Sequence, residues 1–270
     1  MAMNLVVEQQ DNYQDVAAIV TSMTDDEKPF LLETVESIFS DPGIGQVILC
    51  IEENNDWLDS VIGSLLKDPR LMVVRMPMMP PGAVRNKALG HVQKPWIAYC
   101  DGDDVWCKGK TLIQQVYANQ TGADFVGAGH YLTDEGGRIR AYGLARFLPM
   151  PSTWMVRTEI MKRYPFNETL AHGSDGEWWI RTSNIIEKVK CPRVLVRYRV
   201  RSESVSSTTR SKKRKLKLVT VARIPILGLG ILFLSYCIWL FTRHRRYSWT
   251  AGWSRWLQLY EKREQGNRNS

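Results

Sequence analysis

The sequence predicts an α/β fold: one Rossmann-like domain with a mostly parallel sheet over residues 1–205, and an apolar helix after it. Short apolar runs of strand type alternate with segments of helical spacing, which indicates βαβ units. One run, at 96–100, ends in the acidic turn DGDD at 101–104. Open α/β sheets bind ligands at the carboxyl ends of their strands. Residues 224–242 then contain no charged side chain, which predicts a helix that is apolar enough to enter a membrane.

The first half of the domain is expected to contain four strands with helices between them. Each expected strand is a short apolar run, whereas the helices carry apolar residues three and four positions apart. Pro42 and Gly43 stop the first helix, and Pro80 and Pro81 open the third. We expect strands at 16–21, 46–51, 71–74 and 96–100, and helices at 29–40, 57–66 and 83–92.

After the acidic turn the pattern becomes mixed. The turn residues DEGG at 134–137 predict a hairpin. We expect a helix at 110–119, a strand at 124–128, a hairpin at 130–143, helices at 158–163 and 176–186, and a strand at 194–199. The sequence shows no internal repeat, so these elements complete one domain of ordinary size.

Charge is divided unevenly along the chain. The formal net charge is +8, yet the last 70 residues hold 15 of the 36 Lys and Arg and only 3 of the 28 Asp and Glu. The basic character therefore belongs to the tail. Five cysteines without CxxC spacing indicate a reducing compartment, and four scattered histidines give no zinc pattern. The N-terminal residues lack the features of a signal peptide.

Three segments make up the expected tail: a basic linker at 206–223, an apolar helix at 224–242, and an amphipathic segment with basic and aromatic residues at 243–270. The apolar helix would be about 29 Å long, close to the ~30 Å hydrocarbon core of a bilayer. We expect it to span the membrane or, because Pro225, Gly228 and Gly230 permit a kink, to re-enter one leaflet. The alternative is a core helix of a soluble protein.

The last segment is expected to lie in the headgroup region, because its large side chains repeat on one helical face. These side chains are Trp249, Trp253, Trp256, Leu257 and Tyr260. More basic residues precede the apolar helix than follow it, which predicts that the domain faces the cytoplasm. The basic runs are expected to bind anionic lipids. The alternative interpretation is that the basic linker binds nucleic acid, and the adjacent apolar helix argues against it.

The acidic turn is the first candidate for chemistry. Clustered carboxylates raise each other's pKa unless a cation lies among them. Ligand sets made only of oxygen suit Mg²⁺ or Mn²⁺. Gly102 lets the backbone turn sharply and approach a ligand. The turn is therefore either a metal and diphosphate site or an acidic cap for the next helix.

Four stretches give the first 200 residues a likeness to a known family. They are IVTS at 19–22, QVILCIEENND at 46–56, the run from GAVRNKAL to WIAYCDGDDVW over 82–106, and GSDGEWWIR at 173–181. In these stretches the chain resembles family-2 glycosyltransferases of the GT-A fold, which transfer a sugar from a nucleotide diphosphate donor with inversion. The segment YRVRSESVS at 198–206 resembles the family's YR-x-H-x-x-S-x-S, with Arg201 where histidine is common.

The resemblance implies roles for individual residues. It places a metal on Asp101 and Asp103, and it makes Asp175 the general base that deprotonates the acceptor, with Glu177 a weaker candidate. Asp175 also suits the N-terminal cap of the following helix. The residues implied to bind the donor are Thr21, Ser22, Glu52, Glu53, Arg85, Asp101, Asp103 and Arg201. Glutamate replaces the family's usual aspartate after the second strand, and Asp104 has no assigned role.

These features together predict an inverting, membrane-attached glycosyltransferase of the hexosyltransferase type. We expect a UDP-sugar donor, Mn²⁺ or Mg²⁺, and a hydroxyl of a lipid-linked glycan as the acceptor, as in polysaccharide or glycolipid synthesis. One alternative is a polyprenyl-phosphate sugar synthase. Another is a non-catalytic, membrane-anchored module that binds a nucleotide-sugar or a glycan. The presence of Asp101, Asp103 and Asp175 together argues against the module.

Overall fold

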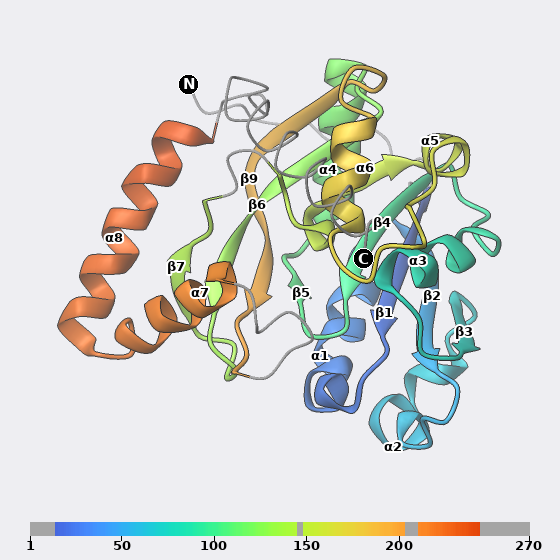
Figure 1. Cartoon of the computed structure of the whole chain (residues 1–270), viewed down its shortest axis with the longest axis horizontal. Coiled ribbons are helices and arrows are strands. Elements are labelled where there is room, and N and C mark those ends of the chain that lie inside the picture. The colour runs from blue at the N-terminus through green and yellow to red at the C-terminus, as the bar shows by residue number, and fades with distance from the viewer. Residues whose placement is uncertain (1–13, 145–147, 203–209, 244–270) are drawn as a thin grey trace, which may run out of the picture.

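Nine strands form one sheet in the computed structural model, which describes residues 14–144, 148–202 and 210–243 (Figure 1). They are β1 (Val16–Ser22), β2 (Ile44–Glu52), β3 (Leu71–Met76), β4 (Trp96–Asp101), β5 (Val105–Trp106), β6 (Phe125–Thr133), β7 (Ile139–Tyr142), β8 (Met155–Arg157) and β9 (Lys188–Arg199). Their order is β3-β2-β1-β4-β8-β6-β9-β5, and β7 pairs with β6 beside this path. Strands β1 to β4 are parallel, so β1 and β4 bring their carboxyl ends together.

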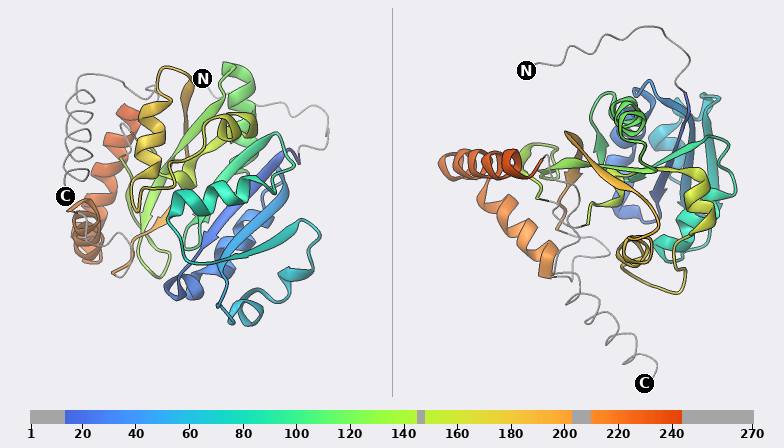
Figure 2. Two further views of the ribbon diagram at one scale, coloured as in Figure 1. Left: turned by 45° about the vertical axis from the view of Figure 1, so that its right-hand side comes forward. Right: turned by 90° about the horizontal axis from the view of Figure 1, so that it is seen from above.

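Helices cover both faces of this sheet (Figure 2). They are α1 (Lys28–Phe39), α2 (Leu58–Ile62), α3 (Pro81–Leu89), α4 (Lys110–Thr121), α5 (Thr158–Arg163), α6 (Ser174–Arg181), α7 (Arg210–Val221) and α8 (Pro225–Thr242), with 3-10 turns η1 (Asp25–Glu27), η2 (Leu65–Lys67) and η3 (Pro151–Thr153). Helices α1, α2 and α4 pack on one face, and α3, α5 and α6 on the other. Strand β1 is buried along its whole length, which accounts for its uninterrupted apolar sequence.

An aromatic cluster fills the core beneath α6. Trp154 lies 5.2 Å from Trp178 and 5.2 Å from Phe125, measured between ring centroids, and all three are fully buried. Tyr99 of β4 meets Trp154 edge-on. Such pairs add about 0.5–1.5 kcal/mol each beyond the area that they bury. The cluster fixes the position of α6 relative to β4, the strand that ends at the pocket described below.

Helices α7 and α8 form a hairpin beside the edge strand β7, at the far left of Figure 1. The backbone N–H of Tyr142 donates to Ser235 Oγ at 3.0 Å, and Trp239 lies 5.4 Å from the Tyr142 ring. Arg140 donates to the carbonyl of Ala222, at the end of α7. In the part of the chain that the structure describes, α8 alone is long and apolar enough to cross a membrane.

The observed elements confirm the expected α/β class and correct several details. The expected helix at 57–66 divides into α2 and η2, and the expected strand at 124–128 continues through the hairpin as β6. The short strands β5 and β8 were not expected, because two or three residues carry no periodic pattern. The expected basic linker at 206–223 contains helix α7. The amphipathic segment expected at 243–270 lies almost wholly outside the described residues.

Candidate functional site

The acidic turn lies where β4 ends beside β1. Thr21 pairs with Asp101 in the parallel register, and the Gly102 N–H donates to the Thr21 carbonyl at 2.8 Å. A Cβ at Gly102 would lie only 2.8 Å from Ser22 Cβ, so the turn requires glycine. The backbone at Gly102 therefore approaches β1 closely, and its expected approach to a ligand stays a prediction.

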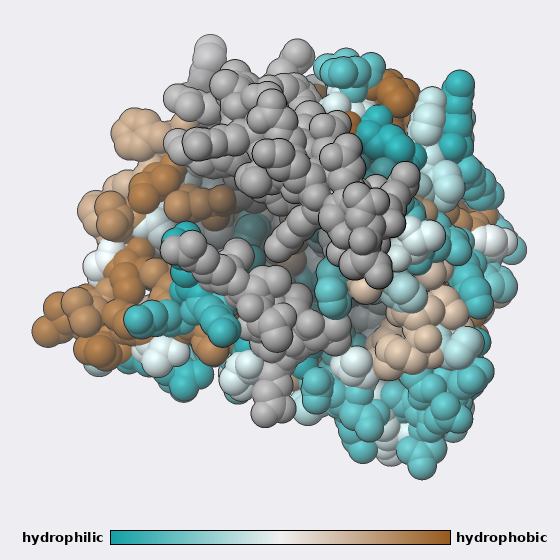
Figure 3. Space-filling view, viewed as in Figure 1, coloured by the Kyte–Doolittle hydropathy of each residue, from teal (hydrophilic) through white to brown (hydrophobic). Residues whose placement is uncertain are grey.

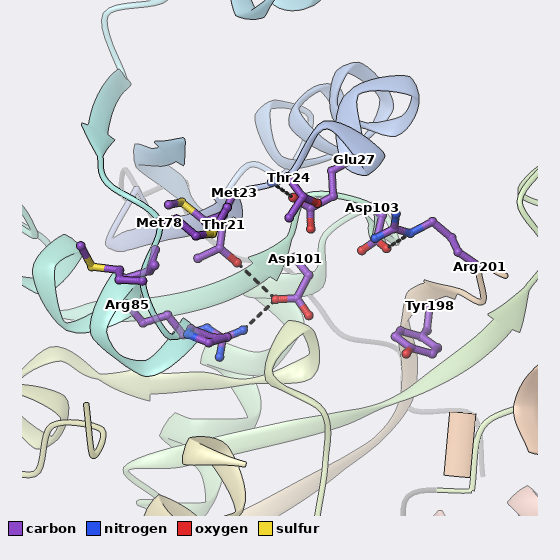
Figure 4. A pocket seen from close by; sticks show the side chains of 13 residues that line it. Thr21, Met23, Thr24, Glu27, Met78, Arg85, Asp101, Asp103, Tyr198 and Arg201 are labelled. Carbon is purple, nitrogen blue, oxygen red and sulfur yellow. Dashed lines mark hydrogen bonds and ion pairs between the residues drawn. The ribbon is translucent and has the colours of Figure 1, made fainter. Parts of the chain in front are cut away.

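A pocket of about 210 Å³ opens at this edge of the sheet (Figure 4). Polar residues of β1, η1, α3, the acidic turn and β9 face one another across it. It is lined by Thr21, Met23, Thr24, Glu27, Met78, Met79, Pro81, Val84, Arg85, Asp101, Asp103, Tyr198 and Arg201. Five of the residues expected from the sequence are thus brought together: Thr21, Arg85, Asp101, Asp103 and Arg201.

Arg85 and Asp101 form the first ion pair of the pocket. Arg85 Nη2 lies 2.7 Å from Asp101 Oδ1, and Thr21 Oγ1 donates to the same oxygen at 3.3 Å. The guanidinium of Arg85 lies over the rings of Tyr99 and Phe166, at 5.8 and 5.9 Å from their centroids. Its Nε is buried without a hydrogen-bond partner among the described residues. Arg85 is therefore held between Asp101 and two aromatic rings.

Arg201 and Asp103 form the second pair. Arg201 Nε lies 2.6 Å from Asp103 Oδ2, and Arg201 Nη1 donates to the Asp26 carbonyl at 2.9 Å. Arg199 links the acidic turn to α1. Its Nε donates to the Asp103 carbonyl at 3.0 Å, and its Nη2 lies 2.6 Å from Glu33. Arginine at position 201 thus contacts the acid that the family resemblance assigns to the metal.

Glu27 adds a third carboxyl group that the sequence did not indicate. Burial and the nearby carboxylates of Asp103 and Asp101 together raise its pKa to about 8, against the opposing effect of Arg201. Its sequence signal was limited to an acid ahead of a helix, which commonly caps that helix. Glu27 does close a capping box with Thr24, and only the folded chain shows that it also faces the acidic turn.

The oxygen donors of this pocket suit a divalent cation. A cation near Asp101 and Asp103 would relieve the repulsion that raises the Glu27 pKa. Within the described ranges, no group of three or more Asp, Glu, His or Cys is arranged to hold a metal by itself. Mg²⁺ often takes only one or two carboxylates and completes its shell with substrate phosphates and water. The acids therefore fit a metal that binds together with a diphosphate.

Asp104 has a structural position instead. Its carboxylate is fully buried and accepts hydrogen bonds from Ser152 Oγ at 2.5 Å and from the Arg199 N–H at 3.1 Å. Burial, with Asp103 and Asp101 nearby, raises its pKa well above the usual range. Asp104 ties η3 and β9 to the acidic turn, so the third acid of DGDD does not face the pocket.

Three other expected donor residues do not line the pocket. Ser22 is fully buried, with its side chain against Gly102. The carboxylate of Glu52 accepts hydrogen bonds from the backbone and side chain of Asn54, at 2.9 and 2.8 Å. Glu53 follows the end of β2, and its N–H donates to Met76. Both glutamates lie at the carboxyl edge of the sheet, two strands away from the acidic turn.

Asp175 lies in the first turn of α6, after Gly173, which adopts a left-handed conformation with φ of 78°. The turn approaches α3 closely, because a Cβ at Gly82 would lie 2.9 Å from Ser174 Cβ. Asp175 thus lies beside the helix that carries Arg85, outside the pocket wall. Glu177 is held by Arg181 at 2.6 Å, which leaves its carboxylate engaged on the helix surface.

Comparisons with known proteins agree with this architecture. Residues 19–188 match the family model described as Glycosyl transferase family 2. The uncharacterized glycosyltransferase MJ1057 of Methanocaldococcus jannaschii is 25% identical over 205 residues, which cover 68% of this chain and 70% of that protein.

Solved structures of TarS from S. aureus share the fold. TarS 1-349 in complex with UDP-GlcNAc has a TM-score of 0.60 at 15% identity, covering 77% of this chain and 66% of that one. The complex with UDP has a TM-score of 0.58 at 15% identity, covering 77% and 64%. This chain spans slightly less than two thirds of the length of these solved chains, and the likeness shows the GT-A fold. The family match covers more than half of the chain, so the chain belongs to glycosyl transferase family 2 and is a glycosyltransferase.

Proposed function

We propose that this glycosyltransferase transfers a sugar with inversion from a UDP-sugar to a hydroxyl of a lipid-linked glycan. The observation that carries the proposal is the alternation of Arg85, Asp101, Arg201 and Asp103 around one pocket at the carboxyl edge of the sheet. Two guanidinium groups suit the oxygens of a diphosphate, and two carboxylates suit a cation bound to it. The TarS structures with UDP and UDP-GlcNAc support a nucleotide-sugar donor on this fold.

Asp101 and Asp103 would hold Mg²⁺ or Mn²⁺. When bound, the cation would neutralise part of the charge that develops on the leaving diphosphate. Arg85, which lines the pocket, would bind the diphosphate through its guanidinium. Arg201, paired with Asp103 in the free protein, would turn to the same phosphates.

Asp175 would act as the general base. The acceptor oxygen forms a bond to the anomeric carbon while the bond from that carbon to the diphosphate oxygen breaks, and the electron pair leaves with the UDP. The proton of the acceptor hydroxyl passes to the Asp175 carboxylate. A single displacement from the face opposite to the diphosphate inverts the anomeric centre.

The proposed location is a membrane surface, with the domain facing the cytoplasm. The apolar helix α8 and the basic residues around it support membrane attachment, because such residues favour anionic lipids. We further propose the domain limits 1–205, 206–223, 224–242 and 243–270 for the catalytic domain, the basic segment, the membrane helix and the interfacial tail.

A polyprenyl-phosphate sugar synthase is a second candidate. Tyr198 lines the pocket, and Lys215 of α7 lies 4.5 Å from its ring centroid, so the tail hairpin reaches the pocket wall. A phosphate acceptor is already ionised at neutral pH and needs no base. Loss of transfer in Asp175→Asn therefore favours the hydroxyl acceptor, and unchanged transfer favours the phosphate.

The donor is tested by hydrolysis of a panel of nucleotide-sugars, with and without Mn²⁺. We expect one UDP-sugar to be hydrolysed in a metal-dependent way, and Asp103→Ala to remove the metal-dependent part of donor binding. Activity that is equal in EDTA and in Mn²⁺ would contradict the metal. Hydrolysis of a sugar on another nucleotide alone would contradict UDP.

A further inference from the structure

Helix α8 has two faces that differ in what they contact. Ser235, Trp239 and Thr242 are buried at spacings of four and three residues, which places them on one side of the helix. The large exposed side chains lie on the opposite side. They are Ile226 at 85% exposure, Leu229 at 70%, Phe233 at 70% and Phe241 at 82%. Figure 3 shows this side as an apolar surface on the left of the molecule.

The inward face of α8 is fitted to the sheet. Ser235 Oγ accepts a hydrogen bond from the Tyr142 N–H on the otherwise open edge of β7, and Trp239 lies 5.4 Å from Tyr142, measured between ring centroids. A Cβ at Gly129 of β6 would lie 3.0 Å from Trp239 Nε1, so a glycine admits the indole. Nearer the start of the helix, Ile231 packs on the small core cluster that joins β6, β7 and α7. Contacts therefore run along most of the helix.

A helix held in this way cannot cross a bilayer while the domain stays folded against it. A crossing would carry β7 into the hydrocarbon together with Arg140, which pairs with Asp134 at 2.7 Å and bonds to Ala222. Charged groups and open strand edges are costly in hydrocarbon. Alternatively α8 would have to leave the sheet, which would expose Trp239 and leave the Tyr142 N–H without its partner.

Basic residues lie at both ends of α8. Arg223 precedes the helix and is exposed, and Arg243 follows it, with its guanidinium 5.5 Å from the Trp239 ring centroid. Exposed Lys213, Arg214 and Lys217 lie on the neighbouring α7. A spanning helix would place the two ends in opposite headgroup layers. A helix lying in the plane of the membrane places all of these cations in one anionic layer.

We infer that α8 lies flat in one leaflet of an anionic bilayer, with its outward apolar face in the acyl region and its inward face on β7. The inference deepens the proposed membrane attachment and rests on it. It replaces the choice between a spanning and a re-entrant helix by a third arrangement, in which the protein itself covers the side of α8 that lipid does not. The pocket is then held near the headgroups, because Tyr198 on its wall contacts α7.

The first test determines on which side of the membrane the two ends of α8 lie. In the full chain with Cys107→Ser and Cys237→Ser, single reporters Glu36→Cys on α1 and Ser270→Cys in the tail are labelled with an impermeant maleimide in sealed membrane vesicles. We expect both reporters to react to the same extent before the vesicles are permeabilised. Protection of the Ser270→Cys reporter alone would show a spanning helix and overturn the inference, while leaving membrane attachment intact.

The second test identifies what covers the outward face. Full-length Phe233→Glu is compared with the parent protein for binding to vesicles of phosphatidylglycerol and phosphatidylcholine. We expect at least a tenfold loss of binding, whereas the control Ile185→Glu, also an exposed apolar position at 53%, keeps parental binding. Equal binding by Phe233→Glu would overturn the inference. So would a dimer that forms through this face in solution and does not bind vesicles.

These outcomes separate the inference from the proposed reaction. Vesicle binding and labelling are measured without donor or acceptor, so failure of every nucleotide-sugar to bind would contradict the reaction alone. Absence of any vesicle binding by the parent protein would contradict both the flat helix and the proposed membrane location.

Discussion

Arg201 Nε lies 2.6 Å from Asp103 Oδ2, so the free protein places a guanidinium where the proposed metal would bind. The cation and the arginine therefore compete for one carboxylate until a diphosphate offers Arg201 another anion. This relationship exists because arginine stands at a position where the family commonly has histidine. Loss of the arginine is therefore expected to change the affinity for the metal and the affinity for the nucleotide in opposite directions.

Arg201→Gln should bind Mn²⁺ more tightly without nucleotide and bind UDP less tightly. Removal of the guanidinium removes its competition with the metal at Asp103, whereas a lost charged hydrogen bond to phosphate costs about 1.5–3 kcal/mol, or roughly ten- to a hundredfold in affinity. Titration calorimetry measures both constants. The control is Arg214→Gln on the exposed surface of α7, which should change neither. Weaker binding of both ligands by Arg201→Gln would contradict the competition.

Asp175→Asn should lower kcat for transfer about 10²–10⁴-fold and leave the Kd for UDP-sugar unchanged, because general base catalysis contributes about this much and Asp175 lies outside the pocket wall. The matched control is Glu177→Gln, two residues further along α6. Its carboxylate is engaged by Arg181, so we expect a change of less than about threefold. Equal losses in both variants would indicate damage to α6 and remove Asp175 from the role.

The sequence predicted the parallel strands β1 to β4 and part of the candidate site for a physical reason. Buried parallel strands are continuous apolar runs, and the acids that end β4 stand out against them. Arg85 could be placed because it follows the start of a helix that leads back to that strand. In the structure Arg85 lies 2.7 Å from Asp101, a contact that the sequence did not predict.

The positions of the remaining site residues could not be predicted, because they depend on contacts between segments that are distant in the sequence. Glu27 looks like a helix cap in the sequence and faces the acidic turn only after η1 folds over β1. Ser22 follows Thr21 on a strand, where neighbouring side chains point to opposite faces, so only one of the two can reach the pocket. Helix α7 was missed because its charges hide the few apolar residues, among them Leu216 and Val219, that dock it on the sheet.

Asp104→Ala should destabilise the fold by about 2–4 kcal/mol, because it leaves the Arg199 N–H and the Ser152 hydroxyl without their buried acceptor. Asp104→Asn keeps an oxygen acceptor for the Arg199 N–H, and its amide can donate to Ser152 Oγ in the reverse direction, so its cost should be smaller than that of Asp104→Ala. Urea unfolding measures both. If Asp104→Ala were as stable as the parent protein but unable to bind metal, Asp104 would be a ligand and not a structural acid.

Protonation of His130 should weaken the contact between the sheet and the tail hairpin. Burial, together with the nearby charges of Lys215 and Lys190, lowers the pKa of this imidazole to about 3. The unfolded chain takes up a proton near pH 6.5 that the folded chain does not, so stability is retained above pH 6.5 and lost as the pH falls toward 3. Between pH 6.5 and pH 4.5 the loss should be about 2 kcal/mol.

His130→Gln removes this dependence, whatever its own cost to packing. The difference in unfolding free energy between His130→Gln and the parent should therefore shift in favour of the variant as the pH falls from 7 to 4.5. Urea unfolding at four pH values measures this shift, and Arg214→Gln on the exposed surface of α7, which removes no group that titrates in this range, serves as a control with the parental slope. Parallel curves for His130→Gln and the parent would show that folding does not lower the pKa of His130.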